Sequence, residues 1–387
     1  LDTTLPDGTP LVLDNGQHIL IGAYTETLRL MRLVGVVPEA TLQRLPLNLQ
    51  FPDGSGLALP RWPSPLDALA GMLSAGGWTW ADKWSLLRAA TGWQRQRFAC
   101  APQVTVADLC ATLTPRVVHM LIEPLCVSAL NTPAARASGQ VFLTVLRDSL
   151  FSGHGSSNLL LPRVDLSSLF PQAAATWLRA RGGEVRLGAR VGQLQWQAPS
   201  RWQVQGEAFE RVLWATASSN AASALAQCAQ AAPESIANAM HAWIDVAQAL
   251  HYEAIATVYA WAPQAQLRQA MLSLHSSATA PAQFVFDRGQ LGGPAGLLAF
   301  VVSASTAERE TLQSQVLAQA RTQLGLELQA VQTVVEKRAT FACTPGLTRP
   351  AMAIAPGLLV CGDYVQGPYP ATLEGAVRSG WAAGSLP

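Results

Sequence analysis

The C-terminal segment of the chain, residues 357–383, constrains the fold more than any other part of the sequence. Residues 357–361 form a short apolar run typical of a buried strand, Gly362-Asp363 predicts a turn, and residues 372–383 predict a helix. Small side chains recur on one face of that helix at spacings of three and four, at Gly375, Ala376, Ser379, Gly380 and Ala383. This face predicts close packing of the helix against a sheet or a flat ring.

The turn and the start of this helix are suited to an anionic or polyhydroxyl ligand. The first amides of a helix have no acceptor within it and carry a partial positive charge, so they attract phosphate groups. The carboxylate of Asp363 can accept hydrogen bonds from a ribityl or ribose hydroxyl. It can equally cap the helix beside it, and the residues alone leave both interpretations open.

Composition excludes several classes of protein. The chain has 387 residues, of which 49% are hydrophobic and 13% are charged, and its net charge is +1. This is too apolar for a disordered chain, and the balanced charge gives no field that would attract a nucleic acid. The six cysteines form no C-x-x-C pair, so no metal site is predicted. No apolar run reaches the roughly 18 residues that a membrane-spanning helix requires.

Strand-like and helix-like segments alternate along the rest of the chain. Apolar patterns predict strands at residues 9–13, 185–187, 191–196, 202–204, 212–214, 256–261, 284–286 and 297–303, with a turn at 198–200. Helical spacing and capping signals predict helices over residues 25–34, 79–98, 106–113, 134–150, 166–181, 219–242 and 306–324. Sheet-forming pieces separated by helical insertions predict two discontinuous domains, between which the chain crosses several times.

Several segments resemble a known family. Cys361-Gly362-Asp363-Tyr364 and residues 369–380, YPATLEGAVRSG, resemble the C-terminal FAD motif of the amine oxidase and phytoene desaturase superfamily. Within it, three further segments resemble the squalene-associated FAD-dependent desaturases, a family of hydroxysqualene dehydroxylases. They are residues 14–18 (DNGQH), residues 130–133 (LNTP) with Ala137-Ser138, and residues 336–341 (EKRATF). The resemblance extends over nearly the whole chain.

The resemblance implies an α/β fold of mixed α+β character. It implies a discontinuous, Rossmann-like FAD-binding domain over residues 1–25, 155–240 and 340–387, and an interleaved substrate domain of helices and an antiparallel sheet over residues 26–154 and 241–339. The family opens with a strand, a G-x-G-x-x-G loop and a helix, which this sequence does not contain. The sequence is therefore expected to start inside the FAD-binding domain, truncated at its N-terminus, and to hold FAD weakly as it stands.

The resemblance also assigns residues to the cofactor, FAD. The residues expected to bind it are Gly16, Gln17, Val191, Ala215, Thr216, Gly362, Asp363, Ala371, Thr372, Leu373 and Ala376. Asp363 would contact the ribityl chain or the pyrophosphate, and the amides of residues 371–373 would face the pyrimidine edge of the flavin. Val191 would pair its backbone with the adenine, residues 215–216 would line the pyrophosphate, and residues 16–17 would lie near the flavin ring.

The implied reaction replaces the hydroxyl of hydroxysqualene by hydrogen, giving squalene, with a hydride delivered from reduced flavin. Such a reaction needs a proton donor, for which the sequence offers His18, His154 and Glu123. Each has a structural alternative, because the two histidines can hold their loops by hydrogen bonds and Glu123 can serve as a helix cap or an ion-pair partner.

Four tryptophans lie close together in the predicted helical region, at Trp78, Trp80, Trp84 and Trp93. Tryptophan side chains suit a membrane-interface anchor or the wall of a tunnel that stabilises a cation. Aromatic residues at helical spacing also pack in cores, and the sequence does not choose between these interpretations.

Two other functions stay open. One is a carotenoid or phytoene-type desaturase, in which the hydride moves the opposite way, and the other is a non-catalytic chain that binds lipids or partner proteins. The main interpretation implies a long-chain isoprenoid substrate, upstream hydroxysqualene-forming synthases as partners, and no nucleic acid. It also implies a cytoplasmic location, with peripheral contact to the inner face of the cytoplasmic membrane.

Overall fold

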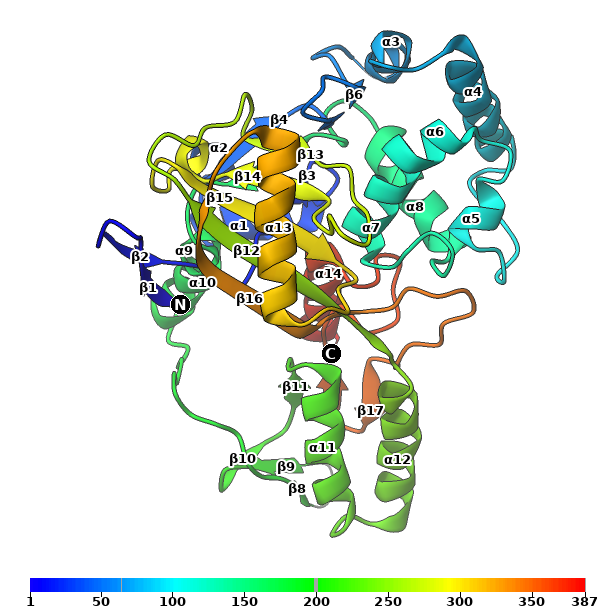
Figure 1. Cartoon of the computed structure of the whole chain (residues 1–387). Helices are drawn as coiled ribbons and strands as arrows, with labels where there is room; N and C mark the ends of the chain where they lie inside the picture. The colour runs from blue at the N-terminus through cyan, green and yellow to red at the C-terminus, as the bar shows by residue number, and fades with distance from the viewer. Residues whose placement is uncertain (64, 198–200, 387) are drawn as a thin grey trace. The chain divides into compact units, whose positions relative to one another are not determined.

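The computed structural model describes residues 1–63, 65–197 and 201–386 and shows a protein of mixed helices and sheets (Figure 1). The chain divides into two compact units. Unit 1 consists of Leu1–Tyr24, Leu30–Thr176 and Tyr252–Pro345. Unit 2 consists of Thr25–Arg29, Trp177–His251 and Gly346–Pro387. Helix α1 (Thr25–Leu33) begins in unit 2 and continues into unit 1.

An antiparallel sheet forms the centre of unit 1, with the strand order β13-β14-β15-β12-β16. Its strands are β12 (Tyr252–Trp261), β13 (Met271–Ser273), β14 (Phe284–Asp287), β15 (Leu297–Ser303) and β16 (Gln329–Phe341). Strand β15 is buried along its whole length, which fits its uninterrupted apolar sequence. Helix α13 (Arg309–Leu324) packs on the sheet through Leu312, Val316 and Ala320, which belong to the same core as Val258 and Phe300.

The remaining strands of unit 1 form small sheets with the orders β3-β7-β4, β1-β2 and β5-β6. Their bounds are β1 (Asp2–Thr4), β2 (Pro10–Val12), β3 (Leu20–Ile21), β4 (Leu42–Leu45), β5 (Asn48–Gln50), β6 (Gly56–Ala58) and β7 (Leu159–Pro162). The helices of this unit are α2 (Pro38–Thr41), α3 (Leu66–Ser74), α4 (Trp80–Arg95), α5 (Val106–Leu109), α6 (Pro115–Val117), the π-helix η1 (Val118–Ile122), α7 (Glu123–Leu130), α8 (Gly139–Leu150), α9 (Leu166–Leu169) and the short η2 (Gly289–Leu291). Helix α10 (Pro171–Arg179) begins in unit 1.

Unit 2 contains a sheet with the order β11-β18-β17 and a meander with the order β10-β9-β8. Its strands are β8 (Leu194–Gln197), β9 (Arg201–Val204), β10 (Glu207–Phe209), β11 (Val212–Trp214), β17 (Ala353–Ala355) and β18 (Leu358–Val360). Its helices are α11 (Ser218–Ala229), α12 (Glu234–Gln248) and α14 (Leu373–Ser385). Strands β11 and β18 run parallel. A parallel pair needs a crossover connection, and here the crossover is long because the chain passes through elements of both units between Trp214 and Leu358.

Most predicted elements are present, and the exceptions have physical reasons. The predicted helix over 166–181 is broken, because Pro171 has no N–H to donate and starts a new helix. The predicted strand at 185–187 was wrong: residues 183–193 form no helix or strand, and no described segment pairs with them. The long strand β16 was missed, and the turn predicted at 198–200 lies outside the described residues.

The predicted domain boundaries near residues 240 and 340 lie close to the observed crossings after His251 and Pro345. Residues 1–24 and 155–176, however, pack with unit 1, whereas the sequence interpretation placed them in the FAD-binding domain. Packing alone does not assign a ligand, so a cofactor role for these segments stays a prediction. Among the described residues, no helix combines the length and the apolar character needed to cross a membrane.

Candidate functional site

The carboxyl ends of the parallel strands β11 and β18 form one edge of the sheet in unit 2. The register places Trp214 opposite Val360, so the residues that follow each strand leave the sheet at the same edge. The hydroxyl of Tyr364 donates to the carbonyl of Thr216 at 3.1 Å, and the N–H of Gly362 donates to the hydroxyl of Ser379 at 2.8 Å. The carboxyl edge of parallel strands is where open α/β sheets bind ligands.

The loop from Asp363 to Thr372 places the start of α14 beside this edge. Ala371 adopts a left-handed conformation with φ of 57°, which reverses the chain before the helix, and its N–H donates to the carbonyl of Asp363 at 3.3 Å. The hydroxyl of Thr372 accepts the N–H of Gly375 at 3.0 Å and caps the helix. The amides of Leu373 and Glu374 have no acceptor among the described residues, so they are available to a ligand.

Gly375 makes this geometry possible. A Cβ atom at this position would lie 2.0 Å from the carbonyl oxygen of Tyr369, so any side chain would push the loop away from the helix. By contrast, Gly380 and Gly384 on the same helix have open space around them. Gly375 therefore lets the loop approach the helix closely. From the sequence we had predicted that the small side chains of this helix pack against the flavin or the sheet.

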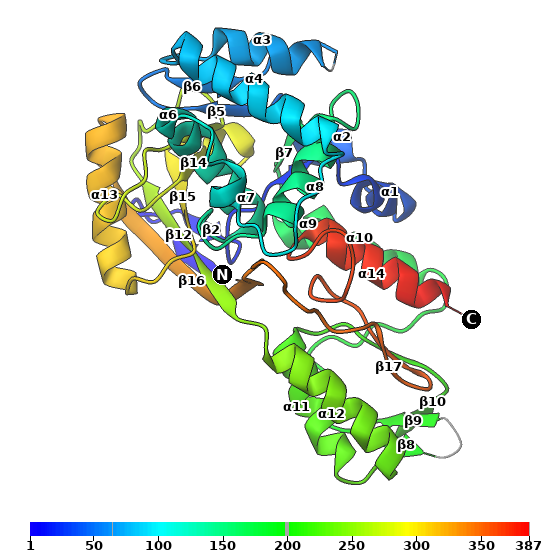
Figure 2. The same ribbon diagram turned by 90° about the vertical axis from the view of Figure 1, so that its right-hand side faces the viewer.

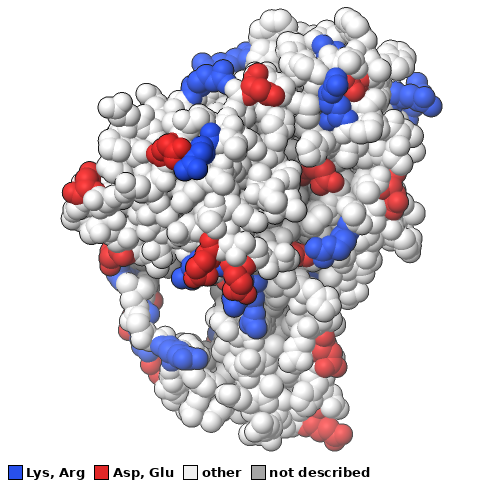
Figure 3. Space-filling view, in the orientation of Figure 1, with Lys and Arg blue, Asp and Glu red and all other residues white. Residues whose placement is uncertain are grey.

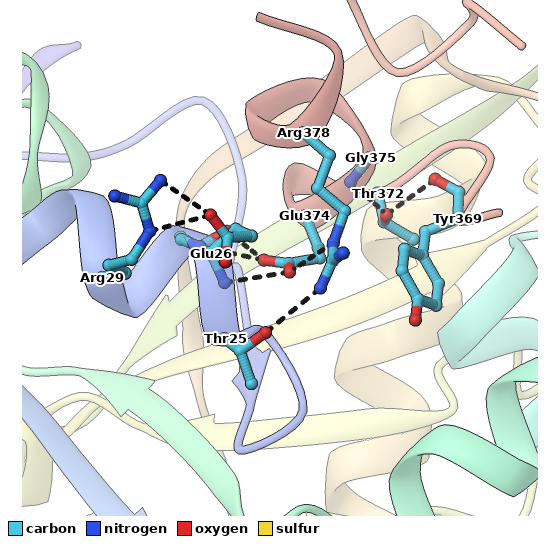
Figure 4. Close-up of polar contacts among 9 residues, drawn as sticks. Thr25, Glu26, Arg29, Tyr369, Thr372, Glu374, Gly375 and Arg378 are labelled. Carbon is cyan, nitrogen blue, oxygen red and sulfur yellow. Dashed lines mark hydrogen bonds and ion pairs between the residues drawn. The ribbon is translucent and has the colours of Figure 1, made fainter. Parts of the chain in front are cut away.

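Glu374 is a functional candidate that the sequence interpretation missed. Glu374 is 1% exposed, and its carboxylate caps the first turn of α1 in unit 2 (Figure 4). It accepts the N–H of Glu26 at 3.0 Å, the N–H of Thr27 at 2.9 Å and the hydroxyl of Thr27 at 2.7 Å. The guanidinium of Arg378 donates to the same carboxylate at 2.8 Å. The only sequence signal was the Glu-x-x-x-Arg spacing, which is common on helix surfaces.

Asp363 lies in the loop that leads to α14, where its carbonyl accepts the N–H of Ala371 at 3.3 Å. Burial raises the pKa of this carboxyl, while hydrogen bonds from the backbone N–H groups of Asp363 and Tyr364 and the charge of Arg349 oppose the shift. The carboxylate therefore lacks the strong donors that would favour its ionised form, and a hydroxyl of a bound ligand can supply one. The hydroxyl of Thr372 caps α14, so the capping role considered for Asp363 belongs to another residue.

In unit 1, the loop containing Gly16, Gln17 and His18 lies against strand β12. The N–H of Gln17 donates to the hydroxyl of Thr257 at 3.4 Å, and the guanidinium of Arg288 donates to the side chain of Gln17 at 3.2 Å. Burial lowers the pKa of His18, and Asp14 opposes that shift. His18 is therefore largely neutral at neutral pH, which weakens its interpretation as the proton donor.

The other two candidate acids lie at separate places in unit 1. His154 is exposed and lines a pocket of about 260 Å³ together with Arg44, Arg61 and Asn158. Glu123 is half-buried and lines a smaller pocket together with His119 and His275. It directly follows the π-helix η1, a distortion that often marks a functional position. The structure thus does not bring the three predicted acids together.

Comparison with known proteins identifies the family. A family model described as flavin containing amine oxidoreductase matches residues 4–384. The chain belongs to this family. The mixed α/β fold and the FAD cofactor that the sequence motif implied are thereby confirmed, and this family member is an FAD-dependent oxidoreductase.

Two relatives of this flavin-containing amine oxidoreductase are named hydroxysqualene dehydroxylase. The protein from Rhodopseudomonas palustris is 25% identical over 407 residues, which cover 98% of this chain and 87% of the relative. The protein from Zymomonas mobilis is 25% identical over 293 residues, which cover 69% of this chain. That match spans 62% of the length of the Zymomonas protein.

Solved structures show the same fold at low sequence identity. An oxidoreductase from Methanosarcina mazei superposes with a TM-score of 0.68 at 14% identity, covering 97% of this chain and 90% of that one. Cyclohexylamine oxidase from Brevibacterium oxydans superposes with a TM-score of 0.60 at 15% identity, covering 97% of this chain and 87% of that one.

The residues of unit 2 fit a flavin nucleotide. Two open helix amides and the half-buried carboxylate of Asp363 lie in the segment that follows β18, and this set of donors and acceptors suits pyrophosphate and ribityl groups. The predicted residues gathered there are Ala215, Thr216, Gly362, Asp363, Ala371, Thr372, Leu373 and Ala376. Val191 lies exposed in the segment without secondary structure, and Gly16 and Gln17 belong to unit 1. Their contacts with the cofactor stay predictions.

Proposed function

We propose that this FAD-dependent oxidoreductase reduces hydroxysqualene to squalene. The observation that carries the proposal is the match to a hydroxysqualene dehydroxylase over 98% of this chain. Sequence segments outside the FAD motif, such as residues 14–18 and 130–133, point to the same narrower family. The substrate would be a long-chain isoprenoid supplied by an upstream synthase that forms hydroxysqualene.

The proposed reaction exchanges one carbon–oxygen bond for one carbon–hydrogen bond. The substrate hydroxyl takes a proton and leaves as water, and a hydride equivalent then forms the new bond at the allylic carbon. When bound, FAD supplies this two-electron chemistry. The protein has to provide the proton, orient the alcohol and exclude water from the cation.

Glu123 is the best placed of the candidate acids. It lies in a pocket whose other polar side chains include His119 and His275, and these imidazoles can return a proton to its carboxylate. His18, in contrast, is kept neutral by burial, and His154 is exposed to solvent, where a general acid would not be shielded from water.

The membrane contact belongs to the same proposal. The substrate is apolar and partitions into bilayers, so an enzyme that takes it up gains from binding the membrane surface. A cytoplasmic protein bound peripherally to the inner face of the cytoplasmic membrane satisfies this requirement without a spanning helix.

The test is product analysis under anaerobic conditions with chemically reduced flavin. We expect hydroxysqualene to be converted to squalene, and we expect Glu123→Gln to lose turnover while it retains flavin. His154→Gln serves as the matched control and should keep turnover. Dehydrogenation of phytoene with no reaction of hydroxysqualene would favour the desaturase alternative, and a flavin-free protein inactive on both substrates would favour a non-catalytic chain.

A further inference from the structure

Helices α3 and α4 of unit 1 carry large apolar side chains on their solvent-facing sides. On α3 these are Leu66, Leu69 and Leu73, and on α4 they are Trp80, Trp84 and Leu87. The spacing of three or four residues places each set on one side of its helix. Together with the exposed Trp62, which precedes α3, these residues are called the α3/α4 face. Trp80 and Trp84 are 76% and 67% exposed, which is unusual for the largest apolar side chain.

The exposure of this face does not come from a loosely formed helix. The opposite side of α4 is buried through Ala89 and Trp93, and its start is closed by a capping box between Thr79 and Asp82. Helix α3 lies beside α4 in both views of the molecule, and the ammonium group of Lys83 on α4 donates to the carbonyl of Leu73 on α3 (Figure 2). The two helices thus lie side by side, and each exposes large apolar side chains.

Most of the charged side chains around the α3/α4 face are basic. Residues 61–97 contain five cationic side chains, at Arg61, Lys83, Arg88, Arg95 and Arg97, and two acidic ones, at Asp67 and Asp82. Both acids are largely buried, at 8% and 4% exposure, and Asp67 lines the pocket that borders the face. Most of the surface visible in Figure 3 is uncharged, and the part formed by α3 and α4 carries blue basic groups with red acidic atoms beside some of them.

A polar pocket borders the face. It has a volume of about 260 Å³, shares Trp62 with the face, and is also lined by Arg44, Arg61, Asp67 and His154. Two guanidinium groups beside an apolar rim suit the phosphate of a lipid headgroup whose chains lie along the rim.

We propose that the α3/α4 face docks on the surface of an anionic lipid bilayer. Tryptophan is favoured at the membrane–water interface, leucine side chains insert among acyl chains, and surrounding Lys and Arg side chains are attracted to anionic headgroups. The α3/α4 face is the surface for the membrane contact proposed above. Vesicle binding needs neither flavin nor substrate, so it can fail while the proposed reaction holds.

Vesicle sedimentation of the purified protein tests the inference without flavin turnover or substrate. We expect binding to vesicles of phosphatidylglycerol mixed with phosphatidylcholine, and weaker binding to phosphatidylcholine alone. The double variant Trp80→Ser/Trp84→Ser should lose affinity about tenfold or more, because two interface anchors are removed. Arg88→Glu should lose about tenfold at low salt and less at high salt.

Matched controls lie on other exposed surfaces. Leu187→Ser removes another highly exposed apolar side chain, and Arg309→Glu inverts an exposed charge on α13, so both should bind vesicles like the wild type. Unaltered unfolding curves would show that the variants remain folded. The inference is overturned if the wild type binds no anionic vesicle or if the tryptophan variant binds equally well. It is also overturned if light scattering shows a dimer that the tryptophan variant abolishes, since a second copy would then cover the face.

Discussion

Helices α4 and α14 both begin with a threonine cap, but they use the acid of their first turn in opposite ways. In α4, Asp82 turns back to Thr79 and accepts its N–H at 2.8 Å, so the negative charge stays at its own helix start. In α14, Glu374 turns away and caps the first turn of α1. The start of α14 therefore keeps its partial positive charge without an acid of its own. One helix start is thus closed by its own acid, whereas the other leaves two amides open, at the place where we predict contacts with FAD.

The largest effect is expected from Glu374→Ala. The change removes a buried carboxylate that accepts from two amides and one hydroxyl of α1, and it leaves Arg378 without this partner. We expect a loss of about 3 kcal/mol in the free energy of unfolding, together with loss of flavin. Urea denaturation measures the first and flavin absorbance the second.

The control for Glu374 is Glu327→Ala, which removes an exposed ion pair with Arg321 and should cost less than about 1 kcal/mol. If Glu374→Ala lowers the free energy of unfolding by as little as Glu327→Ala, the hydrogen bonds of Glu374 with α1 add nothing to stability.

Gly375→Ala should have the next largest effect. The added Cβ would lie 2.0 Å from the carbonyl of Tyr369, so the loop must shift. We expect a loss of about 2 kcal/mol and weaker flavin retention. Gly92→Ala on α4 and Gly380→Ala on α14 meet open space, and each should instead stabilise the protein by up to about 1 kcal/mol. A stabilised, fully flavinated Gly375→Ala protein would contradict the close approach of the loop.

The closed start of α4 predicts a pH dependence. Burial alone would raise the pKa of Asp82, but hydrogen bonds from Thr114 and Thr79 and the charge of Arg116 outweigh it and lower the pKa from 3.8 to about 2. The ionised carboxylate of Asp82 therefore stabilises the folded protein fully above pH 4, and this contribution to the free energy of unfolding is lost as the pH falls from about 4 through about 2. It amounts to about 2 kcal/mol.

Urea denaturation at several pH values between about 2 and 4 measures how the free energy of unfolding changes with pH. Asp82→Asn should make this change smaller while leaving flavin retention at neutral pH unchanged. An unchanged slope in Asp82→Asn would assign the acid sensitivity to other carboxylates.

The smallest effect on stability is expected from Asp363→Asn. Because burial raises the pKa of this carboxyl, its ionised form is unfavourable in the folded protein without ligand. The substitution should leave stability unchanged or slightly higher, while FAD affinity falls about tenfold or more through loss of a charge-assisted hydrogen bond. Titration of the flavin-free protein with FAD checks this. A variant that loses stability but binds FAD normally would show that Asp363 serves the fold.

Local signals in the sequence predicted individual elements well. The strands at 212–214 and 297–303 and the capping box of α4 rest on apolar runs and on residues three positions apart, which fix local structure directly. The strand at 185–187 failed because a strand also needs a partner, and no described segment pairs with it. The four clustered tryptophans differ in burial: Trp78 and Trp93 are buried, whereas Trp80 and Trp84 face solvent.

The sequence by itself determined the family, the cofactor and the strand–turn–helix unit that ends the chain, because these depend on residues close to one another. Only the tertiary structure showed that the carboxylate of Glu374 accepts the N–H of Glu26, which lies 348 positions away in the sequence. Only it showed that Gly375 is needed for the carbonyl of Tyr369, and that the outer sides of α3 and α4 remain uncovered. Spacing along a chain fixes which residues share a helix side, but burial and hydrogen-bond partners depend on which distant segments fold against that side.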